Sequence, residues 1–184
     1  MVLLTTPRLI LREWIRDDLP ALYELDGDPE TVRYVSYGPW TLEECRRDLE
    51  WHMEQQVVVP RSSYSLAVCL RAQEPLIGWC ALAVTSHKHH EAELGYALNR
   101  QCWGQGYIPE AARALLTFGF TTLGLHRVFA TCHPQNQASE RVLQKLGMHK
   151  EGYLRENKWS KGVWRDSLLY ALLAQELALP PARA

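Results

Sequence analysis

In the second half of the chain, the hydrophobic pattern changes from that of a strand to that of a helix, with two glycines in between. Residues 91–98 form a β-type run, and residues 102–108, CWGQGYI, follow shortly after it. From Glu110 to Leu123, apolar side chains recur on one face of a helix and polar side chains on the other. This order predicts a strand, a glycine-containing loop and the longest helix of the chain.

The remaining segments place this unit inside an α/β chain. Two helices are expected after the first strand, one following Asp17 and Asp18 and one beginning at Thr41. Another helix is expected over 136–146 and should end at Gly147. Alternating apolar runs predict strands at residues 8–14, 65–70, 76–84, 91–98, 127–132, 148–155 and 164–172.

Length and composition fit one globular domain over residues 1–184, with a loose tail from about residue 179. The chain is 47% hydrophobic and 22% charged with a formal net charge of −1, which argues against disorder, nucleic-acid binding and an anionic membrane partner. The sequence shows no signal-peptide core and no membrane-spanning run. Five cysteines without a C-x-x-C pair favour a cytoplasmic protein in which Cys69 and Cys80 are buried apolar side chains.

The glycine loop has the composition of an anion-binding turn. Gly104 and Gly106 let backbone amides approach a ligand closely, and the following helix adds unpaired N–H groups and the positive end of its dipole. Pro109 suits the first helical turn, where its missing N–H costs nothing. The pattern predicts a pyrophosphate cradle of amides from Gly104 through Ile108, with tight strand-to-helix packing as the alternative. A Rossmann dinucleotide site is disfavoured because the third glycine of that fingerprint is absent.

Three motifs follow one another along the chain: AELGYALNRQCWGQGYIPEAARALL, NQASERVLQKLGM and EGYLRE. Together they resemble the GNAT superfamily of acetyl-CoA-dependent N-acetyltransferases, and within it the ribosomal-protein alanine acetyltransferase (RimJ/RimL-like) branch. The resemblance extends from TPRLILRE near the N-terminus to the final strand. It implies an α/β (α+β) fold with a mixed, mostly antiparallel central sheet of about seven strands, splayed in the middle and flanked by about four helices.

The resemblance implies acetyl-CoA as co-substrate and no metal. The family signature is R/Q-x-x-G-x-G/A, and this branch often begins it with Trp, which here gives Trp103, Gly106 and Ile108; a register beginning at Gln101 also fits the literal pattern. The strand that ends at Leu98 is implied to offer backbone groups to the pantetheine arm. The implied cofactor-binding residues are Leu98, Trp103, Gly104, Gln105, Gly106, Tyr107, Ile108, Asn136 and Ser139.

An amine must lose its proton before it attacks a thioester, so a base is needed. Glu93 corresponds through the stretch Ala92, Glu93, Leu94 to the glutamate that serves as base in some members of the superfamily. Glu91 is the fallback. The alternative interpretation of Glu93 is an exposed surface charge or a member of a buried ion pair.

A proton donor to the departing CoA thiolate is also implied. The family usually places a tyrosine seven residues after Asn136, but this chain has Leu143 there. Ser139 is the expected substitute, and Asn136 also has the residue type of a helix N-cap. Tyr153 and Tyr170 stand in predicted strands, where core packing is the favoured interpretation.

The acceptor amine is expected to bind between the first two helices and at the polar turn NKWSKG. His87, His89 and His90 cluster in another turn without acidic or cysteine companions, so a solvated turn is favoured over a metal site. The candidate substrate-binding residues are Tyr37, Trp40 and Trp159, together with Tyr34.

The expected activity is direct transfer of an acetyl group to a primary amine, either a small amine or a protein or peptide N-terminal α-amine. The resemblance favours the peptide α-amine and allows a homodimer. A non-catalytic CoA-binding sensor and an enzyme that uses succinyl-CoA or another acyl-CoA are the alternatives.

Overall fold

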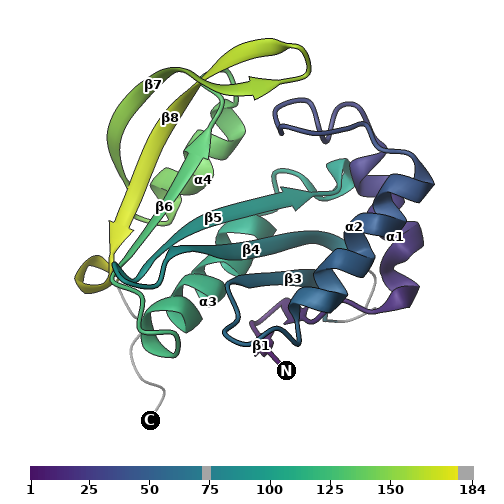
Figure 1. Ribbon diagram of the computed structural model, residues 1–184, viewed down its shortest axis with the longest axis horizontal. Helices are drawn as coiled ribbons and strands as arrows, with labels where there is room; N and C mark the ends of the chain where they lie inside the picture. The colour runs from purple at the N-terminus through teal and green to yellow at the C-terminus, as the bar shows by residue number, and fades with distance from the viewer. Residues whose placement is uncertain (72–75, 178–184) are drawn as a thin grey trace.

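The structure, a computed structural model, describes residues 1–71 and 76–177, which form one eight-stranded sheet (Figure 1). The strand order is β1-β2-β3-β4-β5-β6-β8-β7, and every neighbouring pair is antiparallel except β5 and β6. The predicted mixed, mostly antiparallel sheet is therefore confirmed, while the predicted tail lies outside the described residues. The strands are β1 (Leu3–Thr5), β2 (Leu9–Arg12), β3 (Ser63–Leu70), β4 (Leu76–Ser86), β5 (Glu91–Leu98), β6 (Arg127–Cys132), β7 (His149–Ser160) and β8 (Val163–Leu173).

The α-helices of the described chain are the four predicted ones: α1 (Leu19–Asp26), α2 (Leu42–Gln55), α3 (Tyr107–Thr121) and α4 (Gln137–Lys145). Thr41 caps α2 in a capping box with Glu44, as its sequence indicates. Helix α3 begins three residues before the predicted Glu110, because Gly106 adopts a left-handed φ of +78° and ends the loop there. None of the helices in the described ranges is long and apolar enough to cross a membrane.

The helices cover opposite faces of the sheet. Apolar side chains of α3, such as Ala112 and Leu116, belong to one core cluster with Leu82 of β4 and Leu94 of β5. A second cluster, to which Leu22 of α1 and Cys45 and Leu49 of α2 contribute, lies against the other face at β3. Cys69 and Cys80 are both buried, as expected.

The parallel pair β5 and β6 is short. Only Glu91 to Glu93 of β5 pair with Arg127 to Phe129 of β6, and the remainder of each strand diverges from the other. Figure 1 shows the two strands separating toward the end at which β5 meets the β5–α3 loop. The implied splay in the middle of the sheet is confirmed, and it leaves Leu94–Leu98 without a strand partner on that edge.

Two segments far apart in sequence meet across this opening. The α1–α2 loop, residues 27–41, faces the hairpin formed by β7 and β8 (Figure 1). Lys161 Nζ at the hairpin turn donates a hydrogen bond to the carbonyl oxygen of Val32 at 2.7 Å, and Arg165 Nη1 donates to that of Arg33 at 3.3 Å. These contacts connect the loop to the C-terminal part of the sheet.

Candidate active site

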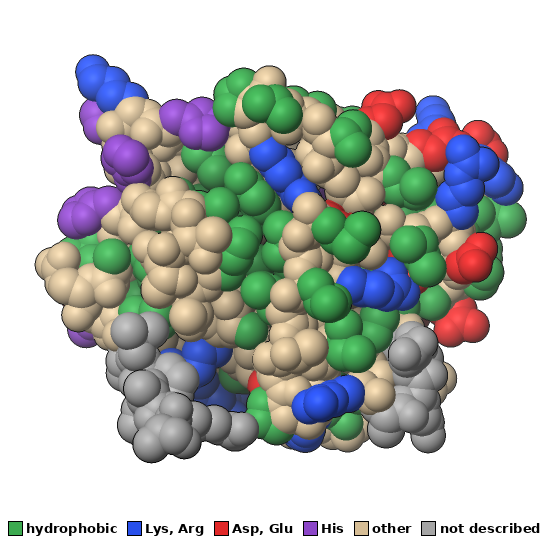
Figure 2. All heavy atoms as spheres, turned by 90° about the horizontal axis from the view of Figure 1, so that it is seen from below, with side chains coloured by type: hydrophobic (Ala, Val, Ile, Leu, Met, Phe, Trp, Pro, Cys, Tyr) green, Lys and Arg blue, Asp and Glu red, His purple; other side chains and the backbone are tan. Residues whose placement is uncertain are grey.

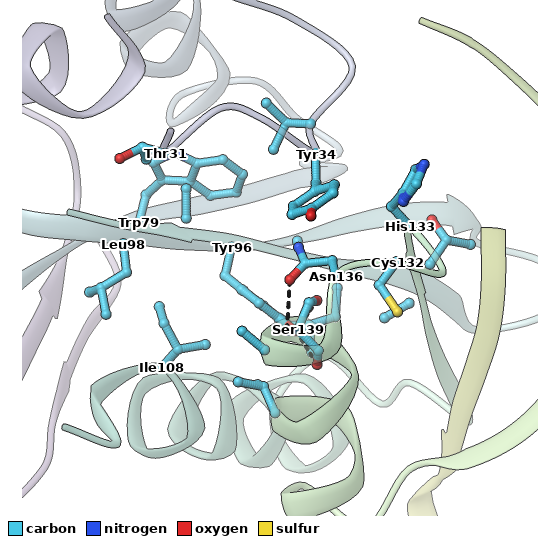
Figure 3. A pocket seen from close by; sticks show the side chains of 18 of the residues that line it. Thr31, Tyr34, Trp79, Tyr96, Leu98, Ile108, Cys132, His133, Asn136 and Ser139 are labelled. Carbon is cyan, nitrogen blue, oxygen red and sulfur yellow. Dashed lines mark hydrogen bonds between the residues drawn. The ribbon is translucent and has the colours of Figure 1, made fainter. Parts of the chain in front are cut away.

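A cavity of about 1000 Å³ passes through the place where β5 and β6 diverge. Side chains from β3, β4, β5 and the α1–α2 loop line it on one face of the sheet, and the β5–α3 loop and the start of α4 line it on the other. Figure 3 shows Trp79 and Tyr34 on one side and Leu98, Ile108 and Ser139 on the other. The cavity thus connects both faces along the free edge of β5.

The β5–α3 loop borders one end of this cavity. Gly104 and Gly106 adopt φ values of +76° and +78°, a conformation that favours glycine. A Cβ atom added to Gly104 would meet no protein atom within 4 Å, so this residue faces open space. Gln105 is outside the lining, and its carbonyl oxygen accepts a hydrogen bond from Arg8 at 2.9 Å. The lining residues of the loop include Trp103, Gly104, Gly106, Tyr107 and Ile108.

The backbone amides of residues 104–108 point to an anion site at this end. Within the described parts of the chain they have no intramolecular hydrogen-bond partner. Gly106 occupies the N-cap position of α3 and has no side chain with which to cap it. Unpaired amides at a helix N-terminus attract anions, and Arg141 and Lys145 of α4 also line the cavity and add positive charge.

Leu98 lies at the end of β5 and lines the same cavity. Its carbonyl oxygen accepts a hydrogen bond of 2.7 Å from the indole nitrogen of Trp103. This contact fixes the Trp103 ring beside the strand and uses one of the backbone groups that the strand end could offer to a ligand.

At the start of α4, two hydroxyl groups face each other. Asn136 caps the helix, because its Oδ1 accepts a hydrogen bond from the Ser139 amide at 3.0 Å. The Ser139 hydroxyl lies 2.9 Å from that of Tyr96 on β5 (Figure 3). Burial raises the pKa of the Tyr96 phenol, which keeps it protonated at neutral pH. Leu143, at the position where the family has tyrosine, is buried in the core.

Glu93 lines the cavity from the opposite face of β5. Its Oε1 accepts a hydrogen bond from Thr131 Oγ1 at 3.1 Å and lies 3.7 Å from Lys158 Nζ. Lys158 in turn donates to Thr131 at 2.8 Å. The carboxylate is therefore both an ion-pair member and 36% exposed in the cavity, so it can accept a proton from a bound molecule.

Glu91, the fallback base, is placed differently. Its Oε2 lies 2.5 Å from a guanidinium nitrogen of Arg127, which also binds Glu151. Glu91 is not among the residues that line the cavity. The structure thus assigns Glu91 to an ion-pair network at the edge where β5 and β6 meet.

Two predicted acceptor-side rings, Tyr37 and Trp40, line the cavity and stack on each other with centroids 4.1 Å apart. The Tyr37 hydroxyl donates to Asp26 Oδ1 at 2.9 Å, and the Trp40 amide donates to the Asp26 carbonyl at 2.9 Å. Burial raises the pKa of the Asp26 carboxyl to about 7, which the hydrogen bond from Tyr37 only partly offsets. The C-terminal residue of α1 therefore holds both rings in place.

Tyr34, the third aromatic residue of this loop, also lines the cavity. Its ring stacks on His133 with centroids 5.2 Å apart. Burial, together with the charge of Arg165, lowers the pKa of His133, which favours the neutral imidazole. The stacked rings of Tyr34 and His133 thus form one part of the cavity wall on this side of the sheet.

Trp159 does not line this cavity. It is 59% exposed and packs edge-on against the equally exposed Trp164. Its neighbours Lys158 and Ser160 do line the cavity, because successive side chains of a strand point to opposite faces. The turn NKWSKG borders the predicted region, but with its polar side chains instead of its tryptophan.

The two remaining tyrosines have different environments. Tyr170 is buried and donates to Glu140 at 2.6 Å, so core packing is confirmed for it. For Tyr153 core packing is wrong: the residue is 53% exposed and bonds to Asp166. The reason is that β7 is the edge strand of the sheet and most of its side chains are exposed.

The cavity residues that were not predicted from the sequence include Tyr96, Trp79, His133 and Lys158. For Trp79 a signal exists, because Gly95 is its diagonal neighbour on β5 and a Cβ there would stand 3.5 Å from the indole. A glycine within a strand indicates close packing by a neighbour. The other three come together only through tertiary structure.

The histidine turn lies outside the cavity. His87, His89 and His90 are exposed between β4 and β5, and His87 Nε2 lies 2.9 Å from Ser62 Oγ. Over residues 1–71 and 76–177, no three His, Cys, Asp or Glu side chains are arranged to hold a metal ion.

Comparison with known proteins identifies a family. A family model described as an acetyltransferase (GNAT) domain matches residues 8–149. The N-acetyltransferase p20 of Bacillus licheniformis is 32% identical over 178 residues, covering 97% of this chain and 99% of that protein. The [ribosomal protein uS5]-alanine N-acetyltransferase of Escherichia coli is 36% identical over 83 residues, or 45% of this chain and 43% of that protein.

The fold agrees with this family. The solved structure of a GNAT-family acetyltransferase from Bacillus anthracis superimposes with a TM-score of 0.84 at 30% sequence identity. The alignment covers 95% of this chain and 100% of that one.

Proposed function

The chain belongs to the GNAT family of N-acetyltransferases, and from that premise we propose that it transfers an acetyl group from acetyl-CoA directly to the α-amine of a peptide or small molecule. The observation that carries this proposal is the continuous cavity along the free edge of β5. It lets an acyl donor on one face of the sheet meet an amine on the other. Bringing both reactants into one site supplies a large part of the rate enhancement in such reactions.

Acetyl-CoA would supply the activated acyl group as a thioester. The residues at the α3 end of the cavity fit its anionic portion, because the unpaired amides of residues 104–108 can bind phosphate oxygens. Gly104 leaves open space where any side chain would project. The free edge at Leu94–Leu98 is available to hold the extended pantetheine arm beside the sheet.

Glu93 is proposed as the general base. Thr131 and Lys158 hold its carboxylate at the cavity wall, where it can contact the amine of a bound acceptor. The demand on this base is modest for an α-amine, whose ordinary pKa of about 8 is more than two units below that of a lysine side chain. An α-amine is therefore the acceptor type that suits an exposed glutamate.

Ser139 and Tyr96 are proposed as the proton donors on the other face of β5. Their hydroxyl groups are 2.9 Å apart. One hydroxyl can therefore donate its proton to the departing sulfur while the other donates a hydrogen bond to the first hydroxyl oxygen. The raised pKa of Tyr96 keeps its proton available at neutral pH. This pair takes the role that the family gives to a tyrosine at the position of Leu143.

A covalent route through cysteine is disfavoured. Cys132 lines the cavity, but burial raises the pKa of its thiol to about 11. The thiolate, which is the nucleophilic form, is scarce at neutral pH. Direct attack by the amine is therefore the proposed route.

The partial relationship to the [ribosomal protein uS5]-alanine N-acetyltransferase supports a protein or peptide amine as acceptor, since that relative is named for acetylating an alanine of a ribosomal protein. Thermal unfolding with acetyl-CoA, followed by thiol release with a panel of peptides and small amines, tests the proposal. We expect a rise in melting temperature and amine-dependent thiol release. No shift at saturating acetyl-CoA would refute cofactor binding, and a shift without thiol release would indicate a CoA-binding sensor.

A further inference from the structure

One face of the β7–β8 hairpin presents two basic side chains and a serine to the cavity. Lys158 and Arg165 are directly opposite each other in the strand pairing and both line the cavity, as does Ser160 two residues further along β7. Like charges that face each other across two strands destabilise the pair. The arrangement therefore calls for a compensating negative charge.

Lys158 has such a charge, because Glu93 lies 3.7 Å from its ammonium group. Arg165 forms no salt bridge with any carboxylate in the described ranges, and its guanidinium donates a 3.3 Å hydrogen bond to the carbonyl oxygen of Arg33. Asp166, next to it, already accepts hydrogen bonds from the Tyr153 hydroxyl and the Glu156 amide. The guanidinium of Arg165 is thus uncompensated at the cavity wall.

The surroundings confirm a concentration of positive charge around Arg165. Burial and the neighbouring guanidinium lower the pKa of Lys161, and the same two causes lower that of His133. Arg33, from the α1–α2 loop, also lines the cavity and is 3.8 Å from the exposed Glu30. A second, smaller cavity of about 490 Å³ adjoins the first and shares Arg33, His133 and Arg165 with it.

Ser160 provides an independent observation. Ser160 is only 4% exposed, and its hydroxyl has no hydrogen-bond partner among residues 1–71 and 76–177. A buried hydroxyl without a partner costs free energy, and it lies in the wall of the same cavity. A bound polar group would satisfy it.

We propose that Arg165 and Ser160 form a subsite for an anionic group on the acceptor, so that the substrate is a primary amine that also carries a carboxylate or phosphate. The amine end would lie at Glu93 and the anionic end at Arg165, with Tyr34 and Trp79 beside the body of the molecule. The same positive charge predicts that polyamines are poor acceptors. This inference rests on the proposed acetyl transfer and narrows its acceptor.

The test compares pairs of acceptors that differ in one negative charge, with each rate expressed per unprotonated amine because that charge also changes the pKa of the amine. One pair of peptides, Ala-Asp-Gly-amide and Ala-Asn-Gly-amide, differs only in the negative charge; phenylalanine and phenylalaninamide form the small-molecule pair, and spermidine is the cationic comparison. We expect kcat/KM to be about 10- to 100-fold higher for the acidic member of at least one pair. The difference should come from a lower KM for that acidic acceptor. Which pair shows the preference tells whether the acid belongs to a peptide or to a free small molecule.

The preference for the acidic acceptor should disappear in the Arg165→Gln variant, which lacks the charge. It should persist in part in Arg165→Lys, which keeps the charge. Arg155→Gln, which removes the same charge from an exposed position of β7 outside both cavities, should leave it unchanged. Equal or better turnover of the neutral members or spermidine, or a preference that survives Arg165→Gln, would overturn the inference while leaving acetyl transfer intact.

A binding measurement separates this inference from the activity. With CoA present, N-acetylphenylalanine should raise the melting temperature of the wild-type protein and of Arg155→Gln but not of Arg165→Gln. If no amine is acetylated, the proposed function fails, and this shift still decides whether the anion subsite exists. Its absence in the wild-type protein, together with no acidic preference in turnover, would refute the subsite.

Discussion

Glu93 and Tyr96 are three residues apart on β5, so their side chains leave opposite faces of the same strand. The resemblance located Glu93, Ser139 and Asn136, because each stands in a motif with recognisable neighbours. It could not locate Tyr96, Lys158 or His133, whose roles depend on contacts across the sheet. At Trp159 the prediction was one residue away from the side chains that line the cavity, since a turn sequence does not reveal which of two alternating faces points inward.

Replacing the base tests the most specific residue assignment. Glu93→Gln should lower kcat/KM by about 10- to 100-fold near pH 6.5 and much less near pH 9, because the amine then loses its proton to solvent. The pH–rate profile measures this. Glu91→Gln is the control, because it removes a carboxylate from the same strand at a position that does not line the cavity. A Glu93→Gln profile parallel to that of the wild type would make the residue structural.

The paired hydroxyls make a second prediction. Tyr96→Phe and Ser139→Ala should each lower kcat by about 10-fold or more with little change in KM for acetyl-CoA, since both act on the leaving group. The double variant should lose less than the product of the two single losses, because the groups share one hydrogen bond. Full activity in both single variants would refute their role.

At the scale of elements, the periodicity of the chain predicts all four helices and seven of the eight strands. Strand β1 was missed because it has only three residues and two of them are exposed. The splay of β5 from β6 follows from the family resemblance and not from either strand alone, since Ala130–Cys132 and Leu94–Leu98 have ordinary strand patterns. The long β7–β8 hairpin and its contact with the α1–α2 loop are tertiary features that local patterns do not encode.

The β5–α3 loop can be tested with two matched glycines. Gly104 and Gly124 both have positive φ, and a Cβ on either would meet no protein atom within 4 Å. Replacement by alanine should therefore cost each a similar 1–2 kcal/mol, roughly, of stability. Only Gly104→Ala should weaken CoA binding, by about 10-fold or more by calorimetry, because its new methyl group enters the cavity end. Equal CoA affinities in the two variants would contradict the assignment of this loop.

At the scale of the whole molecule, the cavity reaches both faces of the sheet along the free edge of β5. The starts of α3 and α4 line the end that we propose binds the cofactor, and the α1–α2 loop and the β7–β8 hairpin line the end proposed for the acceptor. Figure 1 shows these elements on either side of the place where β5 and β6 separate. Figure 2 shows the molecule from below, turned by 90° from Figure 1. On the face seen there, hydrophobic and polar side chains are interspersed, with Lys and Arg scattered among them. The near-zero formal charge of −1 is compatible with a site that binds anions, because backbone amides carry no formal charge and a net charge does not record that Arg165 and Lys161 lie close together.

The pH dependence of stability is influenced by Asp26, the last residue of α1, which is hydrogen-bonded to Tyr37 and Trp40 of the α1–α2 loop. Its pKa is about 7 in the folded protein against an ordinary 3.8, so the folded state holds a proton that the unfolded state releases. The free energy of unfolding should consequently fall as pH rises from about 4 to 7. Asp26→Asn should be more stable than the wild type by about 1–4 kcal/mol at pH 8, with no such gain at pH 4, in urea unfolding. An equal gain in stability at pH 4 and pH 8 would contradict the predicted effect of the Asp26 pKa on stability.

The central claim, direct acetyl transfer across the split in the sheet, is tested most directly by product stoichiometry in a single reaction. With acetyl-CoA and an accepted amine, we expect one N-acetylated amine, identified by mass spectrometry, for each CoA thiol released, and no acetylated enzyme at any time. An acetyl group that accumulates on Cys132, or thiol release without acetylated amine, would contradict the account.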